Sequence, residues 1–170
     1  LASSAYNVRR AQCEHALNEL KEVKPELSAL GQLSNEEFNQ LAGAISEPLE
    51  RQRARHAVLE NNRTLEAVEA LEGNDVVKFG KLMNESHYSL RDDYDVTGKE
   101  LDTLAELAWQ VEGVIGSRIT GAGFGGCTVS LVKNEAIETF KAKVGKAYTE
   151  KIGYAPSFYV ANIADGTHRL

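Results

Sequence analysis

A run of glycines between two strand-like segments constrains the fold of this chain most. Five of its 14 glycines fall within eleven residues, at Gly116, Gly121, Gly123, Gly125 and Gly126. Glycine allows positive φ angles and close approach of the backbone, at a cost in conformational entropy. A loop with this many unobstructed backbone amides suits phosphate, whose oxygens accept several N–H donors at once. The run therefore predicts a functional loop, with a plain hairpin turn as the alternative.

The residues after the run decide which kind of loop it is. Gly121 to Gly126 matches G-x-G-x-x-G, the dinucleotide-binding fingerprint, but that fingerprint requires a helix directly after it to hold the pyrophosphate. Here Cys127, Val129 and Leu131 alternate with polar residues, which predicts a strand. No Gly-Lys-Ser/Thr sequence ends the loop, so the Walker pattern fails too. We therefore predict a glycine-rich loop between two strands.

The rest of the chain predicts an α+β fold that is rich in helices. Apolar spacing, caps and breakers predict helices at about 5–20, from 34, 48–71, 75–90, 99–111 and 134–152. Strands are predicted at 114–119, 127–132 and 157–163. The order strand, strand, helix, strand predicts a small antiparallel sheet with helices covering one face. We expect one domain over residues 1–170.

Composition excludes several classes of partner. A net charge of −6 without any basic run argues against nucleic acid. No apolar stretch approaches the ~20 residues of a membrane span, and no leader is recognisable. Cys13 and Cys127 are predicted to be buried, reduced thiols in a cytoplasmic protein. The four histidines have no metal-ligand spacing, so we expect no metal bound by this chain alone.

The glycine run resembles the third signature motif of the galactokinases. Those enzymes belong to a family of small-molecule kinases that includes the homoserine, mevalonate and phosphomevalonate kinases. The motif runs from Gly116 to Thr128 and reads Gly-Ser-Arg-Ile-Thr-Gly-Ala-Gly-Phe-Gly-Gly-Cys-Thr. Similar blocks stand at Leu1–Glu14, Glu85–Val96, Glu100–Asp102, Pro156–Val160 and Ala164–Gly166. The resemblance thus extends over almost the whole chain.

This resemblance implies a ferredoxin-like C-terminal domain from a two-domain kinase. Because the chain begins at Leu1 and not at methionine, we expect the N-terminal half to be absent. In the family that half carries the sugar-recognition motif, the phosphate loop and the catalytic aspartate. The intact enzyme should transfer the γ-phosphoryl group of ATP to the C1 hydroxyl of galactose with Mg²⁺. Its partners would be galactose, ATP and its own N-terminal domain, and the isolated chain should be inactive.

Tyr6 is the residue to which the resemblance assigns the most specific role. The tyrosine at this position of galactokinases binds the sugar, and a phenol provides a directional O–H on an apolar ring. The resemblance places further residues next to the phosphate site: Ser117, Arg118, Thr120, Gly121, Gly123, Gly125 and Gly126. These residues either contact nucleotide or support the phosphate loop of the absent half. No catalytic residue and no metal ligand is expected in this chain.

Structural roles are favoured for the other polar candidates. Arg9 and Arg10 are expected in ion pairs, whereas for Arg118 an ion pair and a phosphate contact are equally consistent with the sequence. The acidic segment 91–94 more often fixes a helix end than binds metal. His87, on an apolar helix face, is expected to be buried and hydrogen-bonded.

Three alternative functions are consistent with the same residues. The parent protein could phosphorylate a related sugar, such as N-acetylgalactosamine or arabinose. It could also be a non-catalytic galactose sensor that binds sugar and ATP on the same fold. A stand-alone ligand-binding domain is disfavoured by the missing initiator methionine.

Overall fold

The computed structural model describes residues 2–162 of the 170-residue chain. In this part of the chain the helices are α1 (Ala2–Val23), α2 (Asn35–Leu41), α3 (Pro48–Glu72), α4 (Val76–Ser89), α5 (Lys99–Trp109) and α6 (Ile137–Ile152). Two strands, β1 (Val114–Thr120) and β2 (Cys127–Val132), form an antiparallel pair. The helix-rich α+β prediction is confirmed. None of the helices in the described residues has the length and apolar character of a membrane span.

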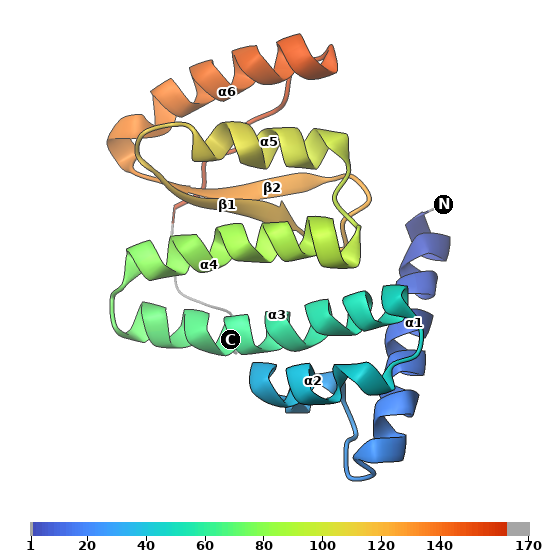
Figure 1. The fold of residues 1–170 in the computed structure, drawn as a ribbon. Helices are drawn as coiled ribbons and strands as arrows, with labels where there is room; N and C mark the ends of the chain where they lie inside the picture. The colour runs from blue at the N-terminus through green and yellow to red at the C-terminus, as the bar shows by residue number, and fades with distance from the viewer. Residues whose placement is uncertain (1, 163–170) are drawn as a thin grey trace, which may run out of the picture.

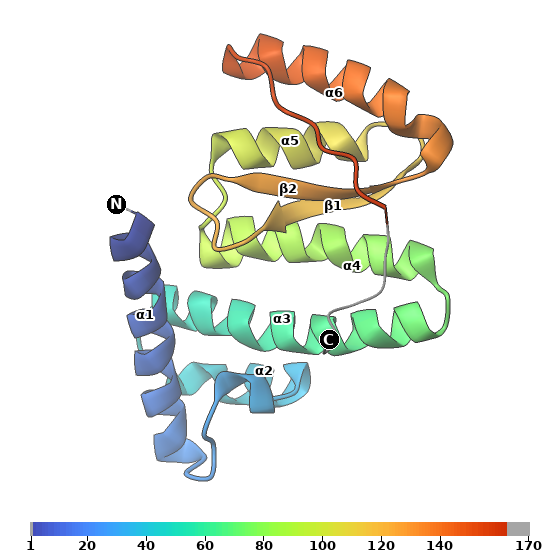
Figure 2. The ribbon, with the colours of Figure 1, turned by 180° about the vertical axis from the view of Figure 1, so that it is seen from behind.

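The elements stack in layers (Figure 1). The order runs from α3 through α4, the two strands and α5 to α6, while α1 crosses one end of α3 and α2 lies beside it. The view from behind shows the same order (Figure 2). The strands thus lie between α4 and α5 in both views, with α4 along the edge of β1.

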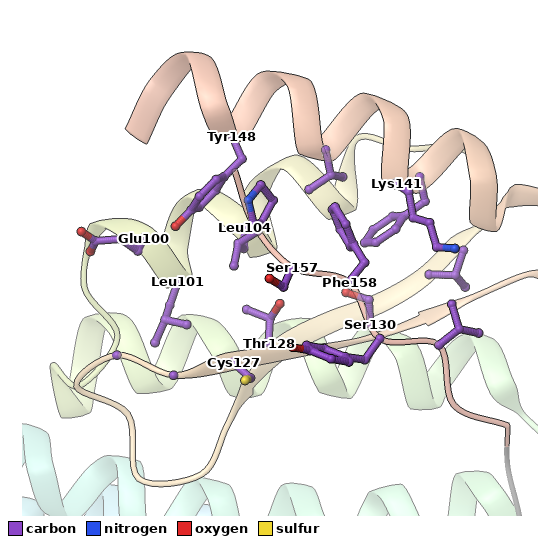
Figure 3. A pocket seen from close by; sticks show the side chains of 18 of the residues that line it. Glu100, Leu101, Leu104, Cys127, Thr128, Ser130, Lys141, Tyr148, Ser157 and Phe158 are labelled. Atoms are coloured by element: carbon purple, nitrogen blue, oxygen red, sulfur yellow. The ribbon is translucent and has the colours of Figure 1, made fainter. Parts of the chain in front are cut away.

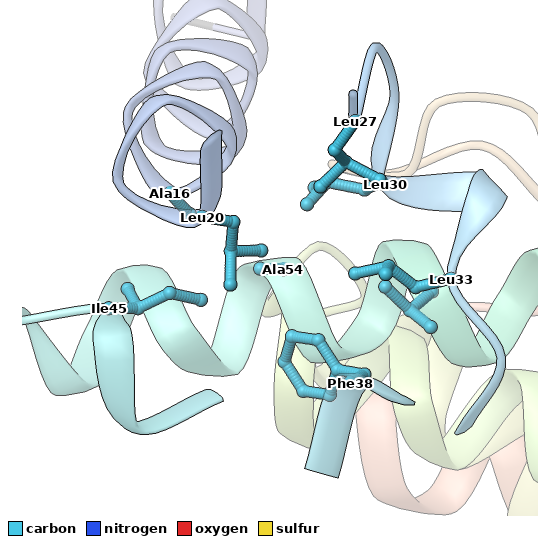
Figure 4. Packing of buried hydrophobic residues seen from close by; sticks show 9 residues of the cluster. Ala16, Leu20, Leu27, Leu30, Leu33, Phe38, Ile45 and Ala54 are labelled. Carbon is cyan, nitrogen blue, oxygen red and sulfur yellow. The ribbon is translucent and has the colours of Figure 1, made fainter. Parts of the chain in front are cut away.

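The helical end of the molecule has a closely packed core (Figure 4). Leu20 from α1, Phe38 from α2 and Ala54 from α3 are almost completely buried against each other. Local sequence sets the boundaries of these helices. Ser34 and Glu37 form the predicted capping box at the start of α2, and Pro48 occupies the first turn of α3.

Helix α4 covers the outer edge of β1, which would otherwise expose unpaired backbone groups. The Ser117 amide donates to Asn84 Oδ1 at 2.8 Å, and the Ile119 amide donates to His87 Nδ1 at 3.3 Å. Glycine makes this approach possible, since a Cβ on Gly116 would lie 2.5 Å from the Gly80 carbonyl oxygen. His87 is buried as predicted, and its Nε2 lies 3.1 Å from an Asp102 carboxylate oxygen.

Two expectations about the C-terminal part of the chain are wrong. Residues 157–162 form no strand, although their residue types favour one. Phe158 instead packs edge-on against Phe140 of α6, with ring centroids 5.8 Å apart, so the segment is held by α6 at this residue. Cys127, predicted to be buried, is exposed at the start of β2. The predicted strand also includes residue 163, which lies outside the described residues.

Candidate functional site

The loop between β1 and β2 holds the most unusual backbone of the molecule. Its four glycines all have positive φ, at Gly121 (82°), Gly123 (80°), Gly125 (105°) and Gly126 (108°). At three of them, Gly121, Gly125 and Gly126, an added Cβ would meet no atom within 4 Å. These glycines are therefore required by the backbone conformation and not by packing. Because the loop is largely exposed, a ligand can approach its backbone.

One point of the loop is anchored to the rest of the molecule. The Phe124 amide donates to the Val96 carbonyl oxygen at 2.7 Å, and Phe124 itself has φ of 60°. The Phe124 ring packs on the buried cluster that includes Val96 and Leu101. A Cβ on Gly123 would lie 2.8 Å from Val96 Cβ, so this glycine is required for close approach as well. The anchor holds the middle of the loop against the turn that precedes α5.

The predicted polar residues of the motif occupy different environments. Ser117 is fully buried, and its hydroxyl lies 2.8 Å from that of Ser130 on β2. Its carbonyl accepts a 3.0 Å hydrogen bond from the Trp109 indole. Arg118 is half-buried in β1, with no side-chain partner among the described residues, and Thr120 is exposed where the loop begins. Arg118 and Thr120 are thus better placed than Ser117 to reach a ligand.

Tyr6 lies near the start of α1, with 54% of its surface exposed. Both views place this end of α1 at the end of the molecule where the loop lies (Figures 1 and 2). Tyr94 is its neighbour there: burial raises the pKa of Tyr94 to about 12, with smaller contributions from Cys13 and Tyr6. The structure thus brings Tyr6 and the glycine loop to one end, although 115 residues separate Tyr6 from Gly121.

Arg9, Arg10 and Asp93 are engaged in structural contacts near this end. Arg9 binds the Asp95 carboxylate at 2.8 Å, and Arg10 pairs with Glu14 one turn along the same helix. Asp93 is buried and accepts both hydrogen bonds of Arg55. The structural roles predicted for Arg9, Arg10 and the acidic segment 91–94 agree with this geometry.

A cavity of about 1520 Å³ lies beside the loop and was not anticipated from the sequence (Figure 3). Its walls come from β2, α5, α6 and the segment 154–162, and one end is formed by loop residues from Phe124. Leu104 and Phe158 give it an apolar centre, with Glu100 and Lys141 as charged groups toward its ends. No sequence signal could locate this cavity, because it depends on the path that residues 154–162 take from the end of α6 past α5 toward the strands (Figure 2).

The described residues contain one group with the composition of a metal site, away from the loop. His15, Glu19 and Glu50 bring ligand atoms within 4.8 Å of one another across α1 and α3. Both Glu19 oxygens already accept hydrogen bonds from Ser46, and His15 pairs with Glu50. The pairing raises the pKa of His15. These contacts connect two helices, which is sufficient to explain the group.

Comparison with known proteins agrees with the motif and the fold. The family model described as GHMP kinases C terminal matches residues 67–150. The galactokinase of Clostridium beijerinckii is 61% identical and that of Clostridium acetobutylicum 59% identical, each over all 170 residues of this chain and 43% of the relative. The chain thus spans less than half the length of these curated relatives. The chain belongs to the GHMP kinase family.

A solved structure supports the same assignment at the level of the fold. The crystal structure of Lactococcus lactis galactokinase complexed with galactose superimposes with a TM-score of 0.91 and 48% identity. The match covers 98% of this GHMP kinase chain and 43% of the crystallised one. The chain is therefore the C-terminal part of the galactokinase fold.

Proposed function

We propose that this chain is the C-terminal domain of a galactokinase. The two-domain enzyme would transfer the γ-phosphoryl group of ATP to the C1 hydroxyl of galactose and release galactose 1-phosphate and ADP. One observation carries the proposal: the chain matches a galactose-bound galactokinase at a TM-score of 0.91 with 48% identity. Its exposed tyrosine and its glycine loop lie at one end of the fold, as a shared cleft requires.

Tyr6 is the proposed sugar contact of this domain. Its phenol is half exposed on the first turns of α1, so the O–H is free to meet a sugar hydroxyl. The helix behind it is held by the buried core through Ala16 and Leu20. A hydrogen-bond donor on a supported helix can orient a sugar without large loss of side-chain entropy, because tyrosine has only two rotatable bonds. The proposed role of Tyr6 is orientation, not proton transfer.

The glycine loop is the proposed phosphate-facing element. The group transferred is the γ-phosphoryl group of ATP. The loop fits the phosphate chain of ATP because its backbone is exposed and its glycines lack side chains. Thr120 and Arg118 at the mouth of the loop can add a hydroxyl and a positive charge. This arrangement neutralises and positions charge, which is the main requirement of phosphoryl transfer.

Magnesium does not fit the described residues of this chain near the loop. Asp95, in the turn that contacts the loop, is already bound by Arg9 and Arg53. We therefore assign the Mg²⁺ ligands, the catalytic base and the adenine pocket to the proposed N-terminal domain. Residues 1–170 would form a single domain that is inactive alone.

We place the enzyme in the cytoplasm, where ATP is available. Both cysteines of the chain are free thiols, which fits a reducing compartment. The proposed N-terminal domain would cover the end of the molecule that bears Tyr6 and Val8, two of its exposed large apolar side chains.

Galactose-dependent ADP release by the two-domain protein tests the proposal, with N-acetylgalactosamine and arabinose as competing sugars. We expect turnover with galactose and a KM for galactose raised ~5-fold by Tyr6→Phe, the effect of about 1 kcal/mol from one lost hydrogen bond. Tyr154→Phe is the matched control, since Tyr154 is similarly exposed (57%). Binding of galactose and ATP without turnover would support the sensor instead. A higher kcat/KM for another sugar would support a kinase for that sugar.

A further inference from the structure

Arg9 connects helix α1 to the turn that precedes α5. Its Nε donates to the Tyr94 carbonyl oxygen at 2.6 Å, and one terminal nitrogen donates to both the carbonyl (3.1 Å) and the carboxylate (2.8 Å) of Asp95. The Arg9 side chain is 13% exposed, so this charge is largely withdrawn from water. Three hydrogen bonds from one planar group fix both the position and the orientation of the turn.

The turn itself has a conformation that needs support. Asp95 has φ of 57° and ψ of 58°, in the left-handed region, directly after the π-helical turn Leu90–Tyr94. For a residue with a side chain this backbone costs free energy that the surroundings must offset. Arg53 from α3 adds a second guanidinium, with hydrogen bonds to the Asp93 carbonyl (2.6 Å) and the Asp95 carboxylate (3.3 Å). The Asp95 carboxylate therefore binds two guanidinium groups, that of Arg9 from α1 and that of Arg53 from α3.

The residue after this turn carries the anchor of the glycine loop. Val96 accepts the hydrogen bond from the Phe124 amide, and no other backbone hydrogen bond in the described part of the chain joins residues 121–126 to an element outside the hairpin. Gly123 packs directly on Val96. The path from Arg9 to the loop is thus continuous: guanidinium, Asp95, Val96, Phe124. A shift of the turn would move the middle of the loop with it.

Tyr6 stands one turn before Arg9 on the same helix. In the described residues the N-terminal turns of α1 lie beyond the buried core, which begins at Ala16. In the described residues, the side-chain hydrogen bonds of Arg9 join this end of α1 to the turn before α5, one turn ahead of Cys13, which packs against the core.

We propose that Arg9 is a positioning residue that couples the helix of Tyr6 to the glycine loop through Asp95 and Val96, and so sets the distance between the sugar and phosphate groups of the site. This inference rests on the function proposed above. A near-attack geometry depends on positions within a fraction of an ångström, so a loosened connection should lower turnover more than it lowers stability.

The test uses Arg9→Ala, Arg9→Lys and Asp95→Asn in the two-domain protein. Asparagine tolerates the left-handed conformation, so Asp95→Asn removes the charge and leaves the backbone undisturbed. Arg10→Ala is the matched control, because Arg10 is exposed and, within residues 2–162, its ion pair is with Glu14 of the same helix. We expect Arg9→Ala to lower kcat at least tenfold and Arg9→Lys to recover part of the loss. Asp95→Asn should lower kcat severalfold, and Arg10→Ala should stay within twofold of the unmodified protein.

A second readout separates this inference from the proposed reaction. Calorimetric titration gives the Kd of ATP with and without galactose, and the ratio measures coupling between the two sites without turnover. We expect Arg9→Ala to bring this ratio toward one, whereas Tyr6→Phe weakens galactose binding itself. If the two-domain protein shows no turnover but Arg9→Ala still brings the ratio of the two Kd values to one, the result would support the coupling and contradict the kinase reaction. An unchanged kcat and an unchanged ratio in folded Arg9→Lys and Asp95→Asn variants would overturn the role of Arg9.

Discussion

Two groups of glycines in this molecule occur for opposite reasons. Gly80 and Gly116 have ordinary backbone angles but lie where α4 and β1 touch, and a Cβ on either would penetrate the other's backbone. Gly121, Gly125 and Gly126 have positive φ but nothing within 4 Å of the missing Cβ. The first group is required by packing, and the second is required by conformation.

This difference separates the part of the molecule that makes the fold from the part that we assign to ligand. At the α4–β1 crossing, the side chains of Asn84 and His87 accept hydrogen bonds from backbone amides of β1, and the close packing leaves no space for a larger residue. At Gly121, Gly125 and Gly126 the backbone has positive φ, which glycine adopts readily, although no neighbouring atom crowds the missing Cβ. Glycines of this kind are typical of loops whose backbone approaches a ligand closely. Alanine variants in the two groups of glycines test whether packing or conformation is the constraint at each position.

The largest effect is expected at the crossing. Gly116→Ala puts a Cβ 2.5 Å from the Gly80 carbonyl oxygen and 2.7 Å from its Cα. Because both neighbours are backbone atoms, they cannot rotate away, and we expect a loss of about 3 kcal/mol or more in the free energy of unfolding. Thermal and denaturant unfolding of the two-domain protein measure this loss. A midpoint equal to that of the unmodified protein would show that the crossing is not closely packed.

The next largest effect is expected from acid, which should lower the free energy of unfolding through the buried His56 of α3. His56 is buried, stacks on Tyr94 and hydrogen-bonds Ser89, and burial lowers its pKa from 6.5 to about 4. The unfolded chain therefore binds more protons below pH 6.5, so acid favours unfolding. We expect a loss of about 3 kcal/mol between pH 6.5 and pH 4, full stability being present above that range. Denaturant unfolding across this range, compared with His56→Gln, measures it. An equal loss in His56→Gln would assign the effect to other groups.

A smaller effect on stability is expected in the loop. Gly125→Ala places a side chain at φ of 105° but in open space. The strain should cost about 1 kcal/mol, because an exposed loop can relax in part. A loss as large as that of Gly116→Ala would remove the distinction between the two groups. Thermal unfolding of both variants side by side decides this.

The smallest effect is expected at Gly43, which belongs to neither group. It lies in the short 3₁₀ turn Ala42–Ala44, with no positive φ and nothing within 4 Å of its missing Cβ. Alanine there restricts mainly the unfolded chain, so Gly43→Ala should raise the free energy of unfolding by about 0.5 kcal/mol. A loss of stability would reveal a constraint that the structure does not explain.

The sequence was sufficient wherever local chemistry determines structure. Ser34 and Pro48 mark helix starts because capping and ring geometry act within one turn. The alternation after Gly126 identified β2 and excluded a dinucleotide loop for the same reason.

Features that depend on distant contacts were not predictable in the same way. Phe158 packs against α6 and not in the sheet because Phe140 provides its partner. Arg9 was expected in an ion pair, but its partner Asp95 is 86 residues away and no pattern connects the two. The motif located the loop, whereas its anchor on Val96 and the cavity beside it required the fold.

The steady-state use of ATP by the Gly125→Ala two-domain protein shows whether the loop serves phosphate. We expect this variant to unfold within about 2–4 °C of the unmodified protein, the shift that about 1 kcal/mol produces in a domain of roughly 150–250 residues. Its kcat/KM for ATP should nevertheless fall at least ~10-fold, which corresponds to about 1.4 kcal/mol of lost transition-state stabilisation. Unchanged use of ATP by a folded Gly125→Ala variant would contradict the assignment of the loop to phosphate.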